Sequence, residues 1–380
     1  METNKVAGKK LSACIAMHMT ASGLVVGSGG DVGNDAWLSL SVSIALSMLL
    51  AWLYSAILSM YPGKGLFDIL IAVFGNVPGK IISGIYAAYA VFLGAEVTRI
   101  LDEFIQLVNL GRTPQIAMLM FMVPLIVWQV RSGLRNIANC SYFVLPILVL
   151  FVLLSFLLGT KFMNLENLKP YFVSGPPAIA KASFSGLMLP LGEIVLATAA
   201  FGEIDPAEKP FPILAKGLLM GGGILLIATF RNILILGAPV NAMYVFSAYN
   251  SVDVISVGDF ITSIAVLIGI NLALAGVVKT SLCVYTASVG MAKVMGLKEK
   301  LQPVAPCCLL VAAIGFQLYD NLLTGLKFLD YIPAYSVPIQ IVLPLIILIV
   351  GKAKQAGKKK KKAAGTKPAA VPPQRQAAEE

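Results

Sequence analysis

Long apolar runs joined by short polar connections constrain this 380-residue chain more than any single motif. Hydrophobic residues make up 58% of the sequence and charged residues only 13%, whereas about a quarter of the residues in soluble domains are charged. A helix needs about 20 mostly apolar residues to cross a bilayer. We therefore predict an all-α polytopic membrane protein with ten transmembrane helices, at residues 11–29, 36–60, 79–108, 114–130, 138–159, 184–201, 214–238, 260–292, 303–319 and 334–350.

Lysine and arginine are distributed unevenly over the connections. If the N-terminal segment 1–10 is cytoplasmic, the cytoplasmic connections carry more than twice the lysine and arginine of the external ones, even without the basic tail at 352–380. Short loops rich in these residues stay on the cytoplasmic side, so both termini are predicted to be cytoplasmic. The tail is expected to be disordered, with Lys358–Lys362 on anionic lipid. Nucleic acid is not an expected partner, because the positive charge is concentrated on one membrane face.

The longest external connection, at 160–183, divides the ten helices into two groups of five. These groups span residues 11–159 and 184–351. An odd number of helices in each half means that two halves with one fold are inserted in opposite orientations. The sequence therefore predicts an inverted repeat in which the helix at 184–201 corresponds to the helix at 11–29.

Two of the predicted helices contain residues that interrupt helical structure. The stretch Phe184–Ala199, FSGLMLPLGEIVLATA, carries Pro190 and Gly192 directly before Glu193. Proline removes a backbone donor, glycine weakens a helix, and a buried carboxylate costs several kcal/mol in a membrane. The run at 20–23, Thr-Ala-Ser-Gly, lies about 15 Å into the first helix, at a similar depth. Interrupted helices at equivalent positions of two inverted halves indicate a binding site near the bilayer midplane.

A ligand site is expected between these two breaks. Half-helix N-termini offer N–H groups to an anion and half-helix C-termini offer carbonyls to a cation, which suits an amino acid zwitterion. The hydroxyl of Tyr89, near mid-depth on the helix at 79–108, is placed to contact a ligand carboxylate. The alternatives are close helix packing through the small residues and aromatic packing of the tyrosine. The predicted ligand-binding residues are Thr20, Ser22, Gly23, Leu24, Tyr89, Pro190, Gly192 and Glu193.

Charged residues inside membrane helices mark either functional sites or ion pairs. Glu193 is interpreted as a site for a ligand ammonium or a proton, with a structural pair to Arg231, at a similar depth, as the alternative. Lys279 is interpreted as a proton-linked switch or as half of a structural ion pair. His18 is interpreted as a hydrogen-bonded structural residue, with a proton relay as the alternative. A run of opposite charges on the helix at 79–108 is expected to pair with itself near the external surface: Glu96, Arg99, Asp102 and Glu103.

Enzyme activity is not expected from this sequence. It contains no nucleophile, metal cluster or nucleotide-binding loop with a supporting context, so neither a cofactor nor a metal is predicted. The five cysteines lie within or beside apolar runs. Their number and spacing do not suggest disulfides or zinc ligation, and they are interpreted as small buried hydrophobic residues.

Five motifs, in order, resemble one known family. They are GDVGNDAW at 30–37, YPGKGL at 61–66, LPLGEIV at 189–195, KTSLCVYTASVGMAKVMGL at 279–297 and YIPAYSVPIQIVLPL at 331–345. Together they resemble the B subunit of bacterial spore germinant receptors, the GerAB-type endospore germination permeases of the amino acid, polyamine and organocation transporter superfamily. The resemblance extends from about residue 10 to residue 351.

This resemblance carries several expectations. It implies a LeuT-like fold of five plus five inverted helices, with helices 1 and 6 broken and a ligand pocket among helices 1, 3, 6 and 8. It implies a spore inner membrane location, a complex with an A subunit and a lipoprotein C subunit, and small germinants that are commonly amino acids. In sodium-coupled members a cation site lies between helices 1 and 8. Lys279, followed by Thr280, would stand where that ion binds, so sodium dependence is not expected.

Three functions are compatible with such a chain. The first is a receptor subunit that binds a germinant in a transporter-like pocket and signals germination. The second is a proton-coupled amino acid permease, and the third is a subunit that conducts ions or water. A receptor and a transporter of one fold differ in whether both gates open in turn, which a sequence does not show. The resemblance favours the receptor subunit.

Overall fold

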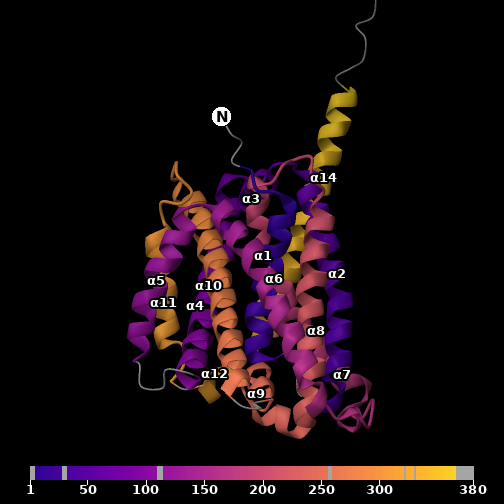
Figure 1. Cartoon of the computed structure of the whole chain (residues 1–380). Coiled ribbons are helices and arrows are strands. Elements are labelled where there is room, and N and C mark those ends of the chain that lie inside the picture. The colour runs from indigo at the N-terminus through magenta and orange to yellow at the C-terminus, as the bar shows by residue number, and fades with distance from the viewer. Residues whose placement is uncertain are drawn as a thin grey trace, which may run out of the picture.

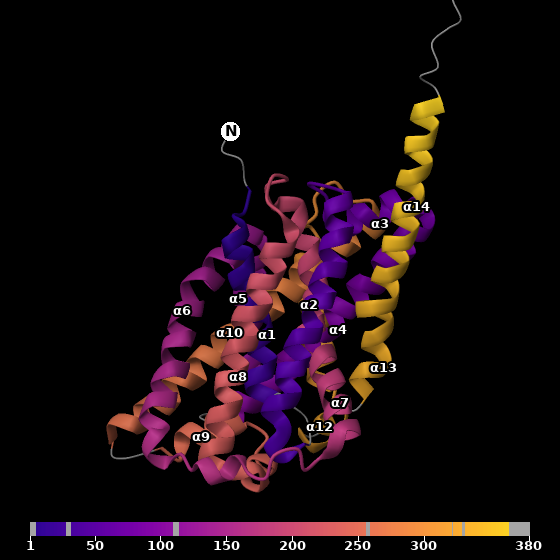
Figure 2. The same ribbon diagram turned by 90° about the vertical axis from the view of Figure 1, so that its right-hand side faces the viewer.

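The computed structural model describes residues 5–27, 32–108, 114–255, 259–320, 322–328 and 331–364. Apart from one isolated parallel bridge between Val6 and Ile204, the regular structure of these residues is helical. Figures 1 and 2 show a bundle in which the long helices run side by side along one axis. This arrangement agrees with the predicted all-α class.

Each of the ten predicted apolar runs coincides with helical structure. The long elements are α1 (Gly8–Val26), α2 (Ala36–Met60), α4 (Asn76–Val108), α5 (Gln115–Arg131), α6 (Leu134–Gly159), α7 (Gly175–Gly186) with η4 (Leu187–Leu191) and η5 (Gly192–Glu203), α8 (Pro210–Met243), α10 (Asp259–Met295), α11 (Val304–Gln317), and α13 (Ile332–Val337) with η7 (Pro338–Val342) and α14 (Leu343–Ala364).

Shorter helices connect these elements. They are η1 (Gly33–Asp35), α3 (Leu66–Phe74), η2 (Thr160–Phe162), η3 (Leu165–Leu168), α9 (Ser247–Asp253) and α12 (Leu322–Phe328). Asp35 fastens the connection at 160–183, because its carboxylate accepts hydrogen bonds from the backbone N–H groups of Phe172 at 2.7 Å and Ser174 at 3.0 Å. The two acceptor oxygens tie the start of α2 to the loop before α7.

Seven helical stretches in the described part of the chain are long and apolar enough to cross a membrane by length and composition. Two shorter apolar helices, α5 and α11, accompany them. The central helix α1, which packs against α6, α8 and α10, is almost completely buried between Leu11 and Val25. The chain is therefore a multi-pass membrane protein with a helix at its core.

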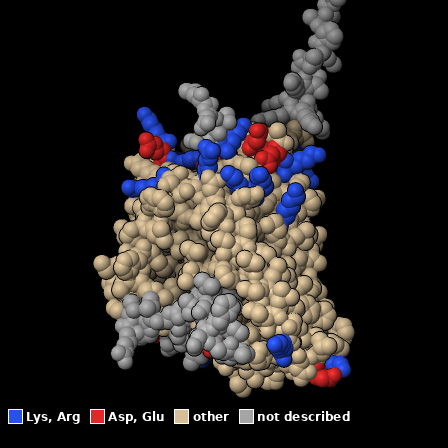
Figure 3. All heavy atoms as spheres, in the orientation of Figure 1, with Lys and Arg blue, Asp and Glu red and all other residues tan. Residues whose placement is uncertain are grey.

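Basic residues mark one end of the bundle. Figure 3 shows lysine and arginine gathered on the face where the chain begins and where α14 leaves the bundle, with few at the opposite end of that view. Lys64, Lys80, Arg131 and Lys209 lie in turns or at helix ends between the long helices. The charge asymmetry of the sequence is thus an asymmetry of the folded molecule.

The predicted disordered tail begins too early. The helix α14 continues past residue 352 to Ala364, because its Lys and Ala residues are good helix formers. The backbone of Lys358–Lys362 belongs to this helix, whereas the side chains of this run and residues 365–380 lie outside the described part of the structure.

The predicted break in the first helix is wrong. The helix α1 runs without interruption through Thr20, Ser22 and Gly23 to Val26 and stops at Gly27, whose φ is 86°. Small residues are compatible with a continuous helix, and the Thr20 hydroxyl donates to the carbonyl of Met17 at 3.1 Å, within its own helix. These residues therefore provide close packing and hydroxyl groups without freeing the backbone.

The helix that carries Glu193 does leave helical geometry. Leu189 has φ −134° and ψ 118°, an extended conformation inside the wide-turned segment η4. This residue precedes Pro190, and a following proline disfavours the helical conformation. A second wide-turned segment that the sequence reading missed, η7, begins at Pro338. The two irregular segments meet where the Gln340 side chain, from η7, donates a hydrogen bond to the carbonyl of Met188 in η4.

Candidate functional site

A buried ion pair occupies the interior of the bundle. Glu193, on η5 just after the irregular backbone, accepts a short hydrogen bond from the ammonium of Lys279 on α10. Lys279 also donates to the hydroxyl of Ser22 on α1. Glu193 is 1% exposed and Lys279 is 0% exposed. Each charge therefore compensates the other in a region where an isolated charge is costly.

His18 adds a third ionisable group to this pair. Its Nε2 lies 3.8 Å from the Glu193 carboxylate, and neither ring nitrogen has a hydrogen-bond partner among the described residues. The hydrogen bond expected for His18 is therefore not found among the described residues. Thr280, next to Lys279, is buried and its hydroxyl likewise has no partner in the described chain. We call His18, Ser22, Glu193 and Lys279 the central cluster.

Arg231 does not pair with Glu193. Its guanidinium donates to the Ser155 hydroxyl at 2.5 Å, to the Asn232 side-chain oxygen at 2.9 Å and to the carbonyl of Ala248 at 2.7 Å. These oxygens come from α6, α8 and α9. Arg231 thus joins three elements through neutral acceptors, and the structural pairing considered for it from the sequence does not form.

Gln340 closes the irregular backbone before Glu193. Its side-chain NH₂ donates to the carbonyl of Met188 at 3.0 Å and to the Tyr89 hydroxyl at 2.8 Å. The backbone carbonyl of Gln340 accepts from Tyr54 at 2.7 Å. Gly192 leaves room for this side chain, since a Cβ there would stand 2.1 Å from Gln340 Oε1. The four residues Tyr54, Tyr89, Gly192 and Gln340 form what we call the glutamine plug.

The sequence reading found part of this plug. Tyr89 and Gly192 were predicted as ligand-binding residues, and the structure places both of them at the break. Tyr54 and Gln340 were missed. The signal available for Gln340 was an amide between Pro338 and Pro344 in a strongly apolar run, a position where an amide needs internal partners.

The other predicted site residues divide into two groups. Ser22, Glu193 and Lys279 meet in the central cluster. Thr20 and Leu24 are buried on α1, and Pro190 is buried at the break. Gly23 lies on the same turn of α1 as Ser22. The central cluster therefore joins α1, η5 and α10, and the glutamine plug joins α2, α4, η5 and η7.

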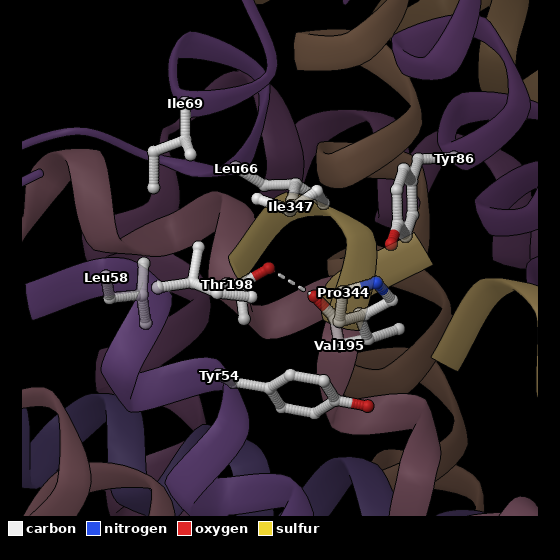
Figure 4. A pocket seen from close by; sticks show the side chains of 10 residues that line it. Tyr54, Leu58, Leu66, Ile69, Tyr86, Val195, Thr198, Pro344 and Ile347 are labelled. Atoms are coloured by element: carbon white, nitrogen blue, oxygen red, sulfur yellow. Dashed lines mark hydrogen bonds between the residues drawn. The ribbon is translucent and has the colours of Figure 1, made fainter. Parts of the chain in front are cut away.

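A small apolar cavity of about 10 Å³, room for about one water molecule, lies beside the glutamine plug. Tyr54 and Tyr86 border it together with aliphatic side chains from α2 and α3, as Figure 4 shows. The Thr198 hydroxyl, which also borders it, donates to the Val195 carbonyl at 2.5 Å. None of the ten residues predicted for ligand or ion binding lines this cavity.

Glu96 is a functional candidate that the sequence reading assigned to structure. Within its charged run, Arg99 pairs with Glu103 at 2.5 Å, which leaves Glu96 outside the pair. Its carboxylate is 2% exposed, and neither oxygen accepts a hydrogen bond of normal geometry from a described residue. It interacts electrostatically with Glu193 and Lys279. Glu96 therefore belongs to the charged interior and not to a surface network.

Hydrogen bonds join several segments at the end of the bundle where α1 begins. The backbone N–H of Val6 donates to the Glu203 carbonyl at 2.9 Å, and that of Gly8 donates to the Glu208 carboxylate at 2.9 Å. The Glu203 carboxylate accepts from Tyr285 at 2.5 Å and from Lys300. The segment before α1, the segment after η5 and α10 are thus joined at this face.

A model of the family described as Spore germination protein matches residues 5–322. The chain belongs to this family. Spore germination protein KB of Bacillus subtilis (strain 168) is 23% identical to it over 362 residues, which cover 93% of this chain and 96% of that protein. Putative spore germination protein YfkT of the same organism is 24% identical over 328 residues, covering 84% of this germination protein and 88% of the relative.

Solved transporter structures share the fold of this germination protein. One is the nucleobase-cation-symport-1 family transporter MHP1, in a closed conformation with bromovinylhydantoin bound. It has a TM-score of 0.64 at 13% sequence identity, and the match covers 92% of this chain and 80% of the MHP1 chain. MhsT in complex with L-phenylalanine has a TM-score of 0.64 at 13% sequence identity, and the match covers 91% of this chain and 98% of the MhsT chain. At this identity the likeness establishes the LeuT-like transporter fold alone.

Proposed function

We propose that this germination protein is the B-type membrane subunit of a spore germinant receptor. It binds a small germinant, preferably an amino acid, inside the bundle and converts occupancy into a conformational signal. The observation that carries this proposal is the buried Glu193–Lys279 pair, which stands directly after irregular backbone and also engages Ser22 on the central helix. The family match supports the germination role.

The central cluster suits a switch because it links three elements through one ammonium. Lys279 holds η5 through Glu193 and α1 through Ser22, so a ligand that alters either contact changes how α10 is tied to both. A buried charge pair responds strongly to a new charge nearby, since there is little solvent to screen it. In this proposal Lys279, Thr280 and Glu193 are ion- or proton-linked, and the lysine ammonium takes the place of a coupling sodium ion.

The ligand site of the proposal lies between the central cluster and the glutamine plug. Both adjoin the irregular backbone at Leu189. The residues assigned to it are Thr20, Ser22, Gly23, Leu24, Tyr89, Pro190, Gly192 and Glu193. Because α1 is continuous, its hydroxyl groups and not free backbone N–H groups supply the polar contacts on that side. Withdrawal of Gln340 from the Met188 carbonyl would free an acceptor for the ligand.

The same proposal includes the membrane organisation. Ten crossings form two inverted groups of five at 11–159 and 184–351, with both termini in the cytoplasm and the protein in the spore inner membrane. The lysine- and arginine-rich face supports this orientation. Receptor A and lipoprotein C subunits are the proposed protein partners, and Lys358–Lys362 contact anionic lipid.

A binding screen on the purified protein tests this function. The 20 common L-amino acids are titrated against the chain in lipid nanodiscs, with intrinsic tryptophan fluorescence as the conformational signal. At least one amino acid is expected to bind and to change the signal, and Glu193→Gln is expected to weaken that response at least tenfold. Glu166→Gln, on the exposed short helix η3, is the matched control. Absence of any response in the wild-type protein contradicts the receptor proposal.

A proton-coupled amino acid permease is the second candidate. The transporter fold of the structural neighbours favours it, because that fold supports alternating access around a central site. Accumulation of labelled amino acid inside liposomes, driven by an inward proton gradient, would establish the permease, whereas binding without uptake supports the receptor. Ion or water flux without solute accumulation would identify a conducting subunit.

A further inference from the structure

Glu96 is a buried carboxylate that has no ion pair with any described residue. Arg99, one turn away on α4, pairs with Glu103. Lys279 makes its contacts with Glu193 and Ser22. Tyr335 interacts with Glu96, but not within the distance and angle limits of a normal hydrogen bond. Leaving a buried acceptor without a partner costs about 1–3 kcal/mol, and more for a charged group.

Charge balance indicates what this carboxylate requires. Glu96 and Glu193 together carry two negative charges when ionised, and Lys279 supplies one positive charge. The pair Glu193–Lys279 is neutral, so one negative charge remains at Glu96 in the interior of a membrane protein. Buried charges in proteins are paired with an opposite charge or are neutralised. When Glu96 is ionised, the group that completes this site carries a positive charge.

Three tyrosines interact with Glu96, namely Tyr89, Tyr319 and Tyr335. Tyr89, Phe92 and Glu96 follow one another at i, i+3 and i+7 on α4, which places them on one face of the helix. Tyr335 lies on that face, with ring centroids 6.4 Å from Tyr89 and 5.4 Å from Phe92. Tyr319 interacts electrostatically with Glu96, and its buried hydroxyl has no partner in the described chain. Aromatic faces attract ammonium groups, and do so more strongly when the site is dry.

We propose that Glu96 and the rings of Tyr89, Phe92, Tyr319 and Tyr335 form a subsite for the protonated amine of the germinant. The proposal rests on the proposed function and specifies its ligand class: small molecules with a primary ammonium group, among them amino acids. Glu193, which the sequence suggested for this role, is already neutralised by Lys279. Of these two carboxylates, Glu96 is the one with both oxygens unbonded to described residues and able to accept from an incoming N–H donor.

Matched ligands provide the test. Each of the 20 common L-amino acids is compared at pH 7 with the acid that lacks its amino group, and butylamine is compared with 1-butanol, by titration of the purified protein in nanodiscs. At least one amine is expected to bind, and its amine-free partner is expected to bind at least 100-fold more weakly. Glu96→Gln should weaken amine binding at least tenfold, whereas Glu166→Gln, on the exposed helix η3, should change it less than threefold.

Stability separates a lost ligand contact from a damaged fold. Ligand-free Glu96→Gln is expected to melt at or above the temperature of the wild-type protein, because the substitution removes an unpaired charge. If this variant does not fold, Tyr335→Leu, which removes one ring and no charge, should weaken amine binding about three- to thirtyfold. That result would retain the aromatic part of the proposal.

Two outcomes would overturn the subsite and leave the receptor function intact. One is a ligand that binds equally well with and without its amino group, which is expected if Glu96 instead holds a proton. The other is an amine that binds Glu96→Gln as tightly as the wild-type protein. If no compound binds the wild-type protein, the proposed function fails together with the subsite.

Discussion

Two buried carboxylates in this protein differ in whether a cation among the described residues pairs with them. Glu193 and Glu96 are 1% and 2% exposed and interact electrostatically with each other. Glu193 follows irregular backbone and is held by Lys279, whereas Glu96 stands on the continuous helix α4 with both oxygens unbonded to described residues. This difference indicates two roles. Glu193, paired with Lys279, holds helices together, whereas Glu96 is the proposed contact for the ligand.

Removing Lys279, the cation that pairs with Glu193, should have the largest effect on stability. Lys279→Met keeps a long side chain but leaves the Glu193 carboxylate buried without its partner. The expected loss is about 3–5 kcal/mol of unfolding free energy, measured by denaturant titration in mixed micelles. Unchanged stability would mean that Glu193 does not depend on Lys279, and the contrast with Glu96 would disappear.

Removing both charges should recover part of that loss. In Glu193→Gln/Lys279→Met no buried charge is left alone, so the double variant is expected to be more stable than the sum of the single effects predicts, by about 1–3 kcal/mol. The same denaturant titration on all four proteins gives this coupling energy. The cycle of Glu96→Gln with Lys279→Met should give a smaller coupling, and an equal value would count against the division of roles.

Adding a side chain at Gly192 tests the packing of Gln340 against the irregular backbone before Glu193. In Gly192→Ala the new Cβ would displace Gln340, which then loses its bonds to Met188 and Tyr89. Overpacking of this kind costs about 1–3 kcal/mol. Gly223→Ala is the control, because a Cβ there meets nothing within 4 Å, and it should be neutral or slightly stabilising. Equal melting temperatures of the two variants would argue against a tight plug.

The smallest effect on stability is expected from a substitution of Glu96. Glu96→Gln removes a charge that has no cation, so the unfolding free energy at pH 7 should change by less than about 1 kcal/mol, or rise. The comparison variant is Glu193→Gln, which leaves the ammonium of Lys279 without its carboxylate and should be clearly less stable. A loss of about 3 kcal/mol or more in Glu96→Gln would show that Glu96 has a partner in the membrane.

The sequence by itself determined the helices and one of their irregularities. Apolar runs of bilayer length identified every long helix, and Pro190 marked the point where the backbone leaves the helix. Both are local properties, because a helix depends on residues within about four positions and proline acts on the preceding turn. The same reasoning erred at Thr20–Gly23, since small residues permit a break without requiring one.

Only the tertiary structure decided which charges meet. Lys279 lies 86 residues from Glu193 along the chain, and Arg231, which the sequence offered as a partner, bonds neutral oxygens instead. Gln340 reaches the carbonyl of Met188 from the far end of the sequence, and Glu96 loses its expected partner to Glu103. Depth along a helix can be counted from the sequence. The direction in which a side chain faces its neighbours depends on how helices pack against one another, and that depends on the whole bundle at once.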